Sequence, residues 1–254
     1  MSINPSISVI LPVYNGGKFI AEAINSVFDQ KYKPLEIIVV DDGSTDNTKD
    51  VLTQYGDKIT YIYQENKGSA SARNTALSAA GNEFISFIDA DDIWNPVKLK
   101  TQLALFEKFK SLEIAMGITA DFDSVFNKEL LHNSVKRFRP VLGSALFKKT
   151  VFEKIGTFDE EMLLGQDVDW FMRARENYIS IATHNDVVLY YRKHKNNVTN
   201  NIQKYNYYIF KAIKKAKDRR KNSESALRLF PDHKPESMEE LMKLWHTVDL
   251  NCDA

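Results

Sequence analysis

Short, nearly unbroken apolar runs alternate along this chain with segments whose apolar residues recur at helical spacing. The runs are typical of strands buried on both faces, and the first four span residues 7–13, 36–40, 59–63 and 84–88. The helical segments between them span residues 19–28, 46–55 and 68–80. Strands that alternate with helices predict an α/β fold with a mostly parallel sheet, right-handed crossovers and helices on both faces.

The alternation continues less regularly toward residue 200. Beyond the fourth strand, the spacing predicts a helix over residues 96–110, strands over 114–119, 141–147 and 187–191, and helices over 149–155 and 167–175. Residues 121–140 fit a hairpin, a flap or a loop with one helical turn, and the sequence does not choose among these.

Polar side chains follow three of the predicted strands at the point where the apolar run stops. Asp89, Asp91 and Asp92 follow the fourth strand, and Asp42 and Tyr14 follow the second and the first. Ligands of parallel α/β sheets bind at these carboxyl ends. Crowded carboxylates need a positive partner, and oxygen ligands suit Mg²⁺ or Mn²⁺, which also bind phosphate. One hypothesis is that Asp89 and Asp91 hold a divalent ion carrying a nucleoside diphosphate. The alternative is that Asp92 or Asn95 caps the following helix while the other acids lie solvated in a turn.

The composition excludes several classes of protein. With 254 residues, 43% hydrophobic and 27% charged, the chain is an ordinary globular protein large enough for one sizeable core. The formal net charge is +0, so no overall field favours nucleic acid as a partner. A single cysteine, Cys252, excludes an intramolecular disulfide framework, and the first residues lack the basic start of a signal peptide. No stretch approaches the ~20 apolar residues of a membrane-spanning helix.

Six stretches together resemble the successive motifs of family 2 glycosyltransferases, as found in bacterial polysaccharide biosynthesis. In order they are ISVILPVYNGGKFI, IIVVDDGSTDNT, GSASARNTAL, FISFIDADDIWNPVKL, GTFDEEMLLGQDVDWFMRAR and YYRKHKNNVT. The resemblance implies a GT-A (Rossmann-like) catalytic domain at residues 1–200 and leaves a helical C-terminal extension at 201–254. It also implies a cytoplasmic enzyme that transfers a sugar from a nucleoside diphosphate sugar with inversion at the anomeric carbon.

The resemblance places Pro12, Tyr14, Asp42, Arg73 and Asp89 at the donor nucleotide. Tyr14 is expected to stack on the base and Asp42 to accept a hydrogen bond from it. A carboxylate suits the N3–H of uracil or thymine, whereas cytosine offers only acceptors there, so Asp42 favours UDP or dTDP. Arg73 is expected to pair with Asp89 or approach the diphosphate. The alternatives are a turn or capping role for Asp42 and a purely structural ion pair for Arg73.

The resemblance also assigns a metal site. Asp89 and Asp91 match the family's Asp-X-Asp motif, and His194 matches a histidine that reaches the metal or the diphosphate in some members. A Mn²⁺ or Mg²⁺ ion held there would act as a Lewis acid on the leaving diphosphate. The alternative for His194 is an ordinary surface or core histidine.

Single displacement requires a base that takes the proton of the acceptor hydroxyl on the face opposite the leaving group. The resemblance places Asp167 in this role. Gln166 replaces the glutamate that usually precedes the base, and the loss of that charge should leave Asp167 less basic. Asp169 is the competing candidate, and a simple helix cap is the alternative for Asp167.

The processive synthases of the family carry a Gln-x-x-Arg-Trp motif and several membrane spans, which this sequence lacks. We therefore expect one sugar to be added per encounter, to a saccharide or lipid-linked saccharide acceptor, with no nucleic-acid partner. Three other classes stay open, and one of them, a basic surface scaffold, rests only on the C-terminal stretch described below. A nucleotidyltransferase would need a Gly-rich, Arg-containing loop after the first strand, where this chain has PVYN. A catalytically inactive sugar-nucleotide or glycan-binding module would keep the fold without turnover.

Residues 205–221 combine apolar positions at helical spacing with dense positive charge, including Lys214, Lys215 and Arg219. One interpretation is a helix packed by its apolar face on the catalytic domain. The other is a helix that lies on the inner face of an anionic membrane and presents the active site to a lipid-linked acceptor. Residues 231–235 then predict a chain break, and residues 238–248 predict one more short helix.

Overall fold

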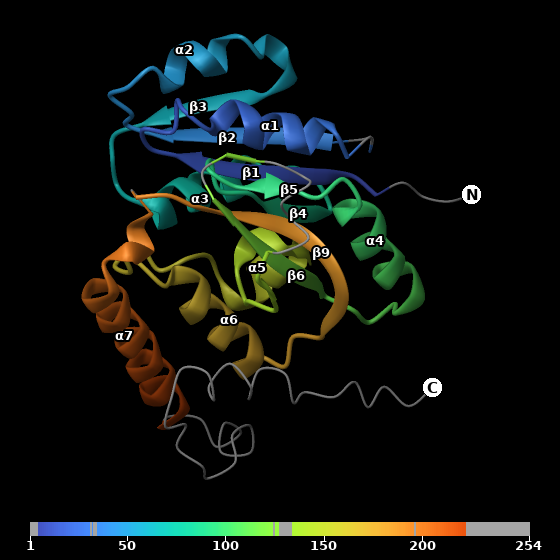
Figure 1. Cartoon of the computed structure of the whole chain (residues 1–254). Helices are drawn as coiled ribbons and strands as arrows, with labels where there is room; N and C mark the ends of the chain where they lie inside the picture. The colour runs from blue at the N-terminus through green and yellow to red at the C-terminus, as the bar shows by residue number, and fades with distance from the viewer. Residues whose placement is uncertain are drawn as a thin grey trace.

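The computed structural model describes residues 5–221 except residues 31, 33, 34, 124, 127–133 and 196. Its strands are β1 (Ile7–Val13), β2 (Leu35–Asp42), β3 (Thr60–Gln64), β4 (Phe84–Phe87), β5 (Ile93–Trp94), β6 (Ile114–Asp123), β7 (Lys136–Arg137), β8 (Ala145–Lys148) and β9 (Ile181–Lys193). Its α-helices are α1 (Ile20–Phe28), α2 (Thr48–Thr53), α3 (Ser69–Ala79), α4 (Lys98–Lys108), α5 (Thr150–Ile155), α6 (Gln166–Glu176) and α7 (Ile202–Lys221). The predicted α/β order is confirmed (Figure 1).

The described strands form one sheet in the order β3-β2-β1-β4-β8-β6-β9-β5, with β7 paired to β6. The pairs among β1 to β4 are parallel, β8 is antiparallel to both β4 and β6, and β9 is parallel to β6. Because two antiparallel steps restore the original direction, β6 and β9 run the same way as β1, β2 and β4. All of their carboxyl ends therefore meet at one edge of the sheet.

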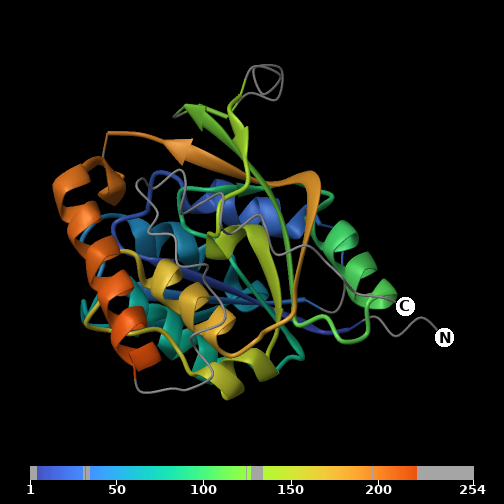
Figure 2. The ribbon, with the colours of Figure 1, turned by 90° about the horizontal axis from the view of Figure 1, so that it is seen from below.

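Helices cover both faces of the sheet because alternate residues of each strand point to opposite sides. Val9 and Leu11 of β1 pack into one core with α1 and α4, whereas Ile10 packs into a second core with α3, α5 and α6. Figure 2 shows α4 and α7 at opposite ends of the molecule. This mixed sheet between two helical layers is the predicted GT-A class of fold.

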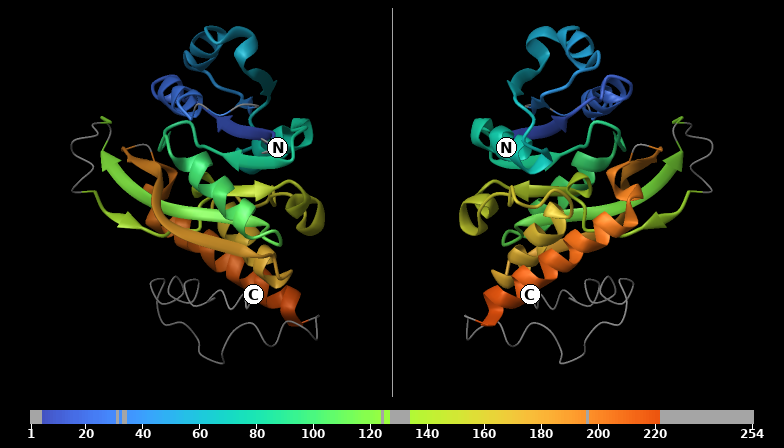
Figure 3. Two further views of the ribbon diagram at one scale, coloured as in Figure 1. Left: turned by 90° about the vertical axis from the view of Figure 1, so that its right-hand side faces the viewer. Right: turned by 90° about the vertical axis from the view of Figure 1, so that its left-hand side faces the viewer.

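Three features of the C-terminal half were not predicted in detail. The two-residue strand β5 pairs antiparallel with β9, so α4 begins only at Lys98. β8 runs antiparallel to its neighbours. β9 is longer than the strand predicted at residues 187–191, and it curves beside β6 (Figure 3). Within the open segment 121–140, β7 pairs with the end of β6, as a hairpin would; residues 124 and 127–133 lie outside the described part.

The last described helix, α7, packs on α6, as Figure 1 shows. Its buried residues are Ile209, Ala212 and Ala216, which recur at helical spacing. The packed-helix interpretation of residues 205–221 is therefore confirmed. None of the helices in the described ranges is long and apolar enough to cross a membrane. The predictions for 231–235 and 238–248 fall outside those ranges.

Candidate active site

The carboxyl edge of the sheet gathers side chains that are far apart in the sequence. Tyr14 follows β1, Asp42 ends β2, and Asp89 and Asp91 follow β4. His194 follows β9, and it reaches the same edge because β9 and β4 run in the same direction. The topology therefore brings together residues that the sequence analysis selected from four separate segments.

Pro12 and Tyr14 form the end of the first strand. Pro12 is buried in β1, and its missing N–H costs no ladder bond because β4 pairs with β1 only as far as Ile10. Tyr14 is 54% exposed, so a ligand can contact its ring. Asn15, in the left-handed region at φ 52°, accepts a hydrogen bond from Thr45 N at 2.7 Å, which fixes this turn to the loop after β2.

Asp42 is held by the residues that lead into α3. Its Oδ1 accepts hydrogen bonds from Gln64 Nε2 at 2.7 Å and Lys67 N at 2.9 Å, and its Oδ2 accepts one from Gly68 N at 2.8 Å. A carboxylate has about four lone-pair sites, so one acceptor position remains on Oδ2. Asp42 thus has a structural role, but not the expected one: Asp41 accepts the hydrogen bond from Ser44 N at 2.8 Å in the turn after β2, and Asp42 holds the segment before α3.

Arg73 and Asp89 form an ion pair in which Nη2 lies 2.7 Å from Oδ1. Arg73 is buried on α3, whereas the Asp89 side chain is half exposed. The Nε–H of Arg73 is buried without a hydrogen-bond partner in the part of the chain that the structure describes. A buried, unpaired guanidinium N–H is costly, so part of the hydrogen-bonding capacity of Arg73 is unused in the described structure.

Asp91 and His194 face each other at the ends of β4 and β9. Oδ2 of Asp91 lies 2.8 Å from Nε2 of His194 and 3.5 Å from Nδ2 of Asn197. Burial and the negative charge of Asp89 raise the pKa of Asp91, and the contact with His194 opposes this. A cation placed here would relieve that repulsion.

These residue types fit a divalent ion of which the protein supplies only part of the coordination. A carboxylate oxygen and an imidazole nitrogen are suitable ligands for Mn²⁺, and diphosphate oxygens and water complete such sites. Asp89, the third predicted ligand, is engaged by Arg73. Among the described residues, no group of three or more His, Cys, Asp or Glu side chains could hold a metal alone.

Arg192 is a site residue that the sequence analysis missed. It is fully buried on β9, where its Nε donates to the main-chain oxygen of Asp91 at 2.6 Å and its Nη2 donates to Glu22 Oε2 at 3.0 Å. Its guanidinium also lies between the rings of Phe19 and Phe122, 4.4 and 4.7 Å from their centroids. The sequence signal that could have identified it is an arginine directly after the apolar run at residues 187–191. Arg192 fixes the main chain of the Asp-Ala-Asp turn.

Asp92 is not a helix cap, so that interpretation is wrong. Its carboxylate is buried and accepts a hydrogen bond from the main-chain N–H of Arg192 at 3.0 Å. β5 separates it from α4, and the main-chain N–H of Val97, just before that helix, donates instead to Asn95 Oδ1 at 3.2 Å. Burial and the charges of Asp91 and Asp89 raise its pKa well above the ordinary value. Asp92 joins the turn after β4 to β9.

Asp167 lies in the first turn of α6, near the Arg73–Asp89 ion pair. Burial raises its pKa, the positive charge of Arg73 opposes this, and the charge of Asp89 adds to it. Gln166, the residue before it, donates to Ser69 Oγ at 2.8 Å, which joins the start of α6 to the start of α3. The helix contacts therefore hold Asp167 beside the acidic edge of the sheet.

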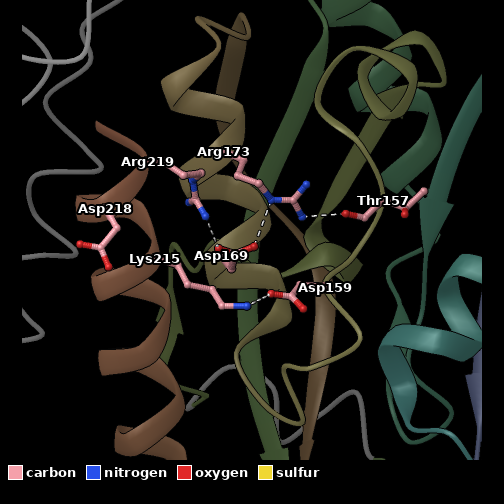
Figure 4. A pocket seen from close by; sticks show the side chains of 7 residues that line it. All are labelled: Thr157, Asp159, Asp169, Arg173, Lys215, Asp218 and Arg219. Carbon is pink, nitrogen blue, oxygen red and sulfur yellow. Dashed lines mark hydrogen bonds and ion pairs between the residues drawn. The ribbon is translucent and has the colours of Figure 1, made fainter. Parts of the chain in front are cut away.

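Asp169, two residues on, faces a different part of the molecule. Its oxygens accept hydrogen bonds from Arg173 Nε and Arg219 Nη1, each at 3.0 Å, and its side chain is 2% exposed. Figure 4 shows it between the two arginines in a cavity of about 580 Å³ between α6 and α7. Lys215 and Asp159 form another ion pair across this cavity. The ion pairs that line this cavity attach α7 to the rest of the domain. They lie away from the carboxyl edge of the sheet.

An acidic edge on a mixed GT-A sheet, with a partly exposed aspartate on the adjacent helix α6, is typical of glycosyltransferases. The chain belongs to glycosyl transferase family 2, whose family model matches residues 8–170. It is 33% identical over 219 residues to an uncharacterized glycosyltransferase of Rickettsia typhi, across 78% of this chain and 67% of that protein. It is also 45% identical over 103 residues to a putative teichuronic acid biosynthesis glycosyltransferase of Bacillus subtilis, across 39% of this chain and 41% of that protein.

Solved structures share the fold. TarS 1–349 of S. aureus in complex with UDP-GlcNAc gives a TM-score of 0.72 at 24% identity, across 86% of this chain and 67% of that one. The mannosyltransferase PcManGT of Pyrobaculum calidifontis in complex with GDP-Man and Mn²⁺ gives a TM-score of 0.68 at 23% identity, across 85% of this chain and 65% of that one. Family membership removes the nucleotidyltransferase alternative.

Proposed function

We propose that this protein transfers one sugar from a UDP-sugar to a hydroxyl of a saccharide or lipid-linked saccharide, with inversion and with the assistance of a divalent ion. Residues 1–200 are the catalytic domain in this proposal, and residues 201–254 are a helical extension. One observation carries it: the Arg73–Asp89 ion pair lies within electrostatic reach of both Asp91 and Asp167. The proposed metal ligand and the proposed base would therefore act around one spot.

The choice of nucleotide rests on Asp42 and Tyr14. The remaining acceptor position of Asp42 suits the N3–H of uracil, and the exposed ring of Tyr14 offers a stacking surface. Proteins of similar fold have been solved with both UDP-GlcNAc and GDP-Man, so the fold alone does not select the base. The carboxylate is the feature that favours UDP.

The leaving diphosphate would lie beside Arg73 and the Asp91–His194 pair. Mn²⁺ or Mg²⁺ bound by Asp91 and His194 would neutralise charge on the diphosphate as the glycosidic bond breaks. Arg73 donates one N–H to Asp89, and other N–H groups of the same guanidinium could donate to a phosphate oxygen. Arg192 keeps Asp91 in place through its main-chain oxygen.

Asp167 is the base in this proposal. It would accept the proton of the acceptor hydroxyl as that oxygen attacks the anomeric carbon. Burial raises the pKa of Asp167, and a raised pKa makes a carboxylate a better proton acceptor. Asp169 is a poorer choice because both of its oxygens are occupied by arginines.

The face of α7 opposite its packed side could contact an anionic membrane. Tyr207 and Phe210 are 63% and 70% exposed, and Lys214, Lys217 and Lys221 continue the same helical stripe. Lys215 and Arg219, by contrast, hold α7 to the domain through ion pairs with Asp159, Glu161, Asp169 and Glu176. A helix can therefore be packed on the domain and still present a basic, aromatic face to lipid.

The decisive experiment is UDP binding with and without Mn²⁺, followed by UDP release from UDP-sugars. Asp91→Asn should abolish the Mn²⁺-dependent part of donor binding and turnover while leaving folding nearly intact, because the side chains have the same shape. Asp57→Asn is the matched control, since Asp57 is exposed ahead of β3 at the opposite edge of the sheet. Full activity of Asp91→Asn would refute the metal assignment, and UDP binding without turnover by the unmodified protein would support the inactive-module alternative.

A further inference from the structure

Three basic side chains converge on one buried carboxylate beside the candidate site. Asp121, near the end of β6, has a side chain that is 5% exposed. Arg139 contacts both of its oxygens at 2.9 Å, Lys193 Nζ lies 2.8 Å from Oδ2, and Arg137 Nη2 lies 3.3 Å from it. We call Arg137, Arg139 and Lys193 the basic cluster.

The basic cluster carries more charge than its carboxylate can balance. Three cations and one carboxylate leave two positive charges, and one remains even when the exposed Asp123 on the same face of β6 is counted. Arg137 and Lys193 are about half exposed and could extend into solvent, yet both side chains point at Asp121. A concentration of like charge of this kind raises the local concentration of anions.

The position of the basic cluster links it to the site. Lys193 directly precedes His194, which contacts Asp91. The guanidinium of Arg139 lies 5.2 Å from the ring centroid of Tyr191, the residue of β9 that pairs with Asp121. The cluster therefore occupies the β6 side of the strand that brings His194 to the metal residues.

Arg139 also interacts electrostatically with Tyr205 of α7. Burial raises the pKa of Tyr205 to about 12, with the negative charge of Asp167 adding to the rise and the positive charge of Arg139 opposing it. Tyr205 is thus within electrostatic reach of both Asp167 and Arg139. Tyr205 is therefore a common neighbour of the basic cluster and of Asp167, the residue beside which the acceptor hydroxyl would lie in the proposed displacement.

We propose that the basic cluster binds an anionic group, a phosphate or a carboxylate, of the acceptor. The proposal rests on the proposed function. The donor diphosphate would already have positive partners in Arg73 and in the ion that Asp91 and His194 would hold, so the basic cluster is left for a second anionic group. The planar fork of Arg139 matches the geometry of carboxylate and phosphate oxygens.

The test compares three sugars that differ in the group at C6: glucose with a neutral hydroxymethyl, glucuronate with a carboxylate and glucose 6-phosphate with a phosphate. Their binding to the protein saturated with UDP and Mn²⁺ is measured by saturation-transfer NMR titration. We expect both anionic sugars to bind the unmodified protein about tenfold more tightly than glucose, since one charge-assisted pair is worth about a factor of ten. Arg139→Gln should reduce this preference to below about threefold and change UDP affinity by less than about twofold.

Two further variants keep the test interpretable. Lys193→Gln removes a half-exposed member and should also weaken the preference, and Asp121 stays paired in each single variant because two cations remain. Lys136→Gln is the control. Lys136 is the exposed neighbour of Arg137 and pairs with Ala120 on β6, so this variant loses one positive charge outside the cluster and should still prefer the anionic sugars.

Two outcomes would overturn the inference. One is equal binding of all three sugars by the unmodified protein. The other is a UDP affinity that falls about tenfold or more in Arg139→Gln while the sugar preference persists, because the basic cluster would then serve the donor. An unmodified protein that does not bind UDP with Mn²⁺ would instead refute the proposed function, and the sugar titrations without nucleotide would still decide the charge preference.

Discussion

Asparagine substitutions at Asp167 and Asp169 separate catalysis from stability within two residues of one helix. Both changes are isosteric, and both remove one negative charge from the first turn of α6. The structure gives the two carboxylates different surroundings: Asp167 is near the Arg73–Asp89 pair, whereas Asp169 lies between Arg173 and Arg219. The same chemical change should therefore have two distinct effects.

Asp167→Asn should lower turnover without lowering stability. Loss of a general base typically costs a factor of ~10² to 10⁴ in rate, about 2.7 to 5.5 kcal/mol. Folding raises the pKa of Asp167, so the folded state binds its proton more tightly than the unfolded state does. Its contribution to stability is present at low pH and is lost as the pH rises through the folded pKa. At pH 8 the asparagine variant avoids this cost, so its Tm should equal or exceed that of the unmodified protein.

Asp169→Asn should do the reverse. Asparagine keeps one acceptor but turns an NH₂ group toward an arginine, and it removes the charge that both arginines share. Arg173 also donates to Ile155 O and Thr157 O, and Arg219 also pairs with Glu176, so neither is left without an acceptor. We therefore expect a cost of about 2 to 4 kcal/mol rather than more. For a chain of this size, that is a fall in Tm of roughly 5 to 15 °C.

The assays are thermal unfolding at pH 8 and the initial rate of UDP release at saturating donor and Mn²⁺, at a temperature where both variants are folded. The rate of the unmodified protein should also fall as the pH decreases through a value above the ordinary range for aspartate, because the base must be deprotonated. A large loss of rate in Asp169→Asn with a normal rate in Asp167→Asn would show that the base has been misassigned.

Two more predictions concern the donor and the membrane. Asp42→Ala should weaken UDP binding by about 1 to 3 kcal/mol, measured by calorimetry, because a buried base N–H would lose its acceptor; unchanged affinity, with the fold intact by circular dichroism, would place the base elsewhere. Changing Lys214, Lys217 and Lys221 together to Gln should abolish salt-sensitive sedimentation with vesicles that contain anionic lipid and leave UDP binding unchanged, because each exposed lysine can contribute ~1 kcal/mol near such a surface. No sedimentation of the unmodified protein at low ionic strength would contradict membrane contact.

Much of the fold follows from local pattern. The apolar runs and helical spacings of the first 90 residues predict β1 to β4 and α1 to α3, because strands buried on both faces and amphipathic helices have distinct periodicities. The rule that parallel strands bind ligands at their carboxyl ends then places Tyr14, Asp42, Asp89 and Asp91 together. The motifs in the second half supplied Asp167 and His194 by resemblance alone.

Tertiary structure decided what local pattern could not encode. The reversed direction of β8 and the pairing of β5 with β9 depend on contacts between segments about 60 to 100 residues apart, and no local spacing reports them. The burial of Arg192 likewise depends on partners from α1 and from the turn after β4. Asp167 and Asp169 have different surroundings because each residue along a helix is rotated by about 100° from the one before. Two carboxylates in the same turn therefore contact different neighbours. Sequence fixes which groups are present, and packing fixes which of them remain available to a substrate.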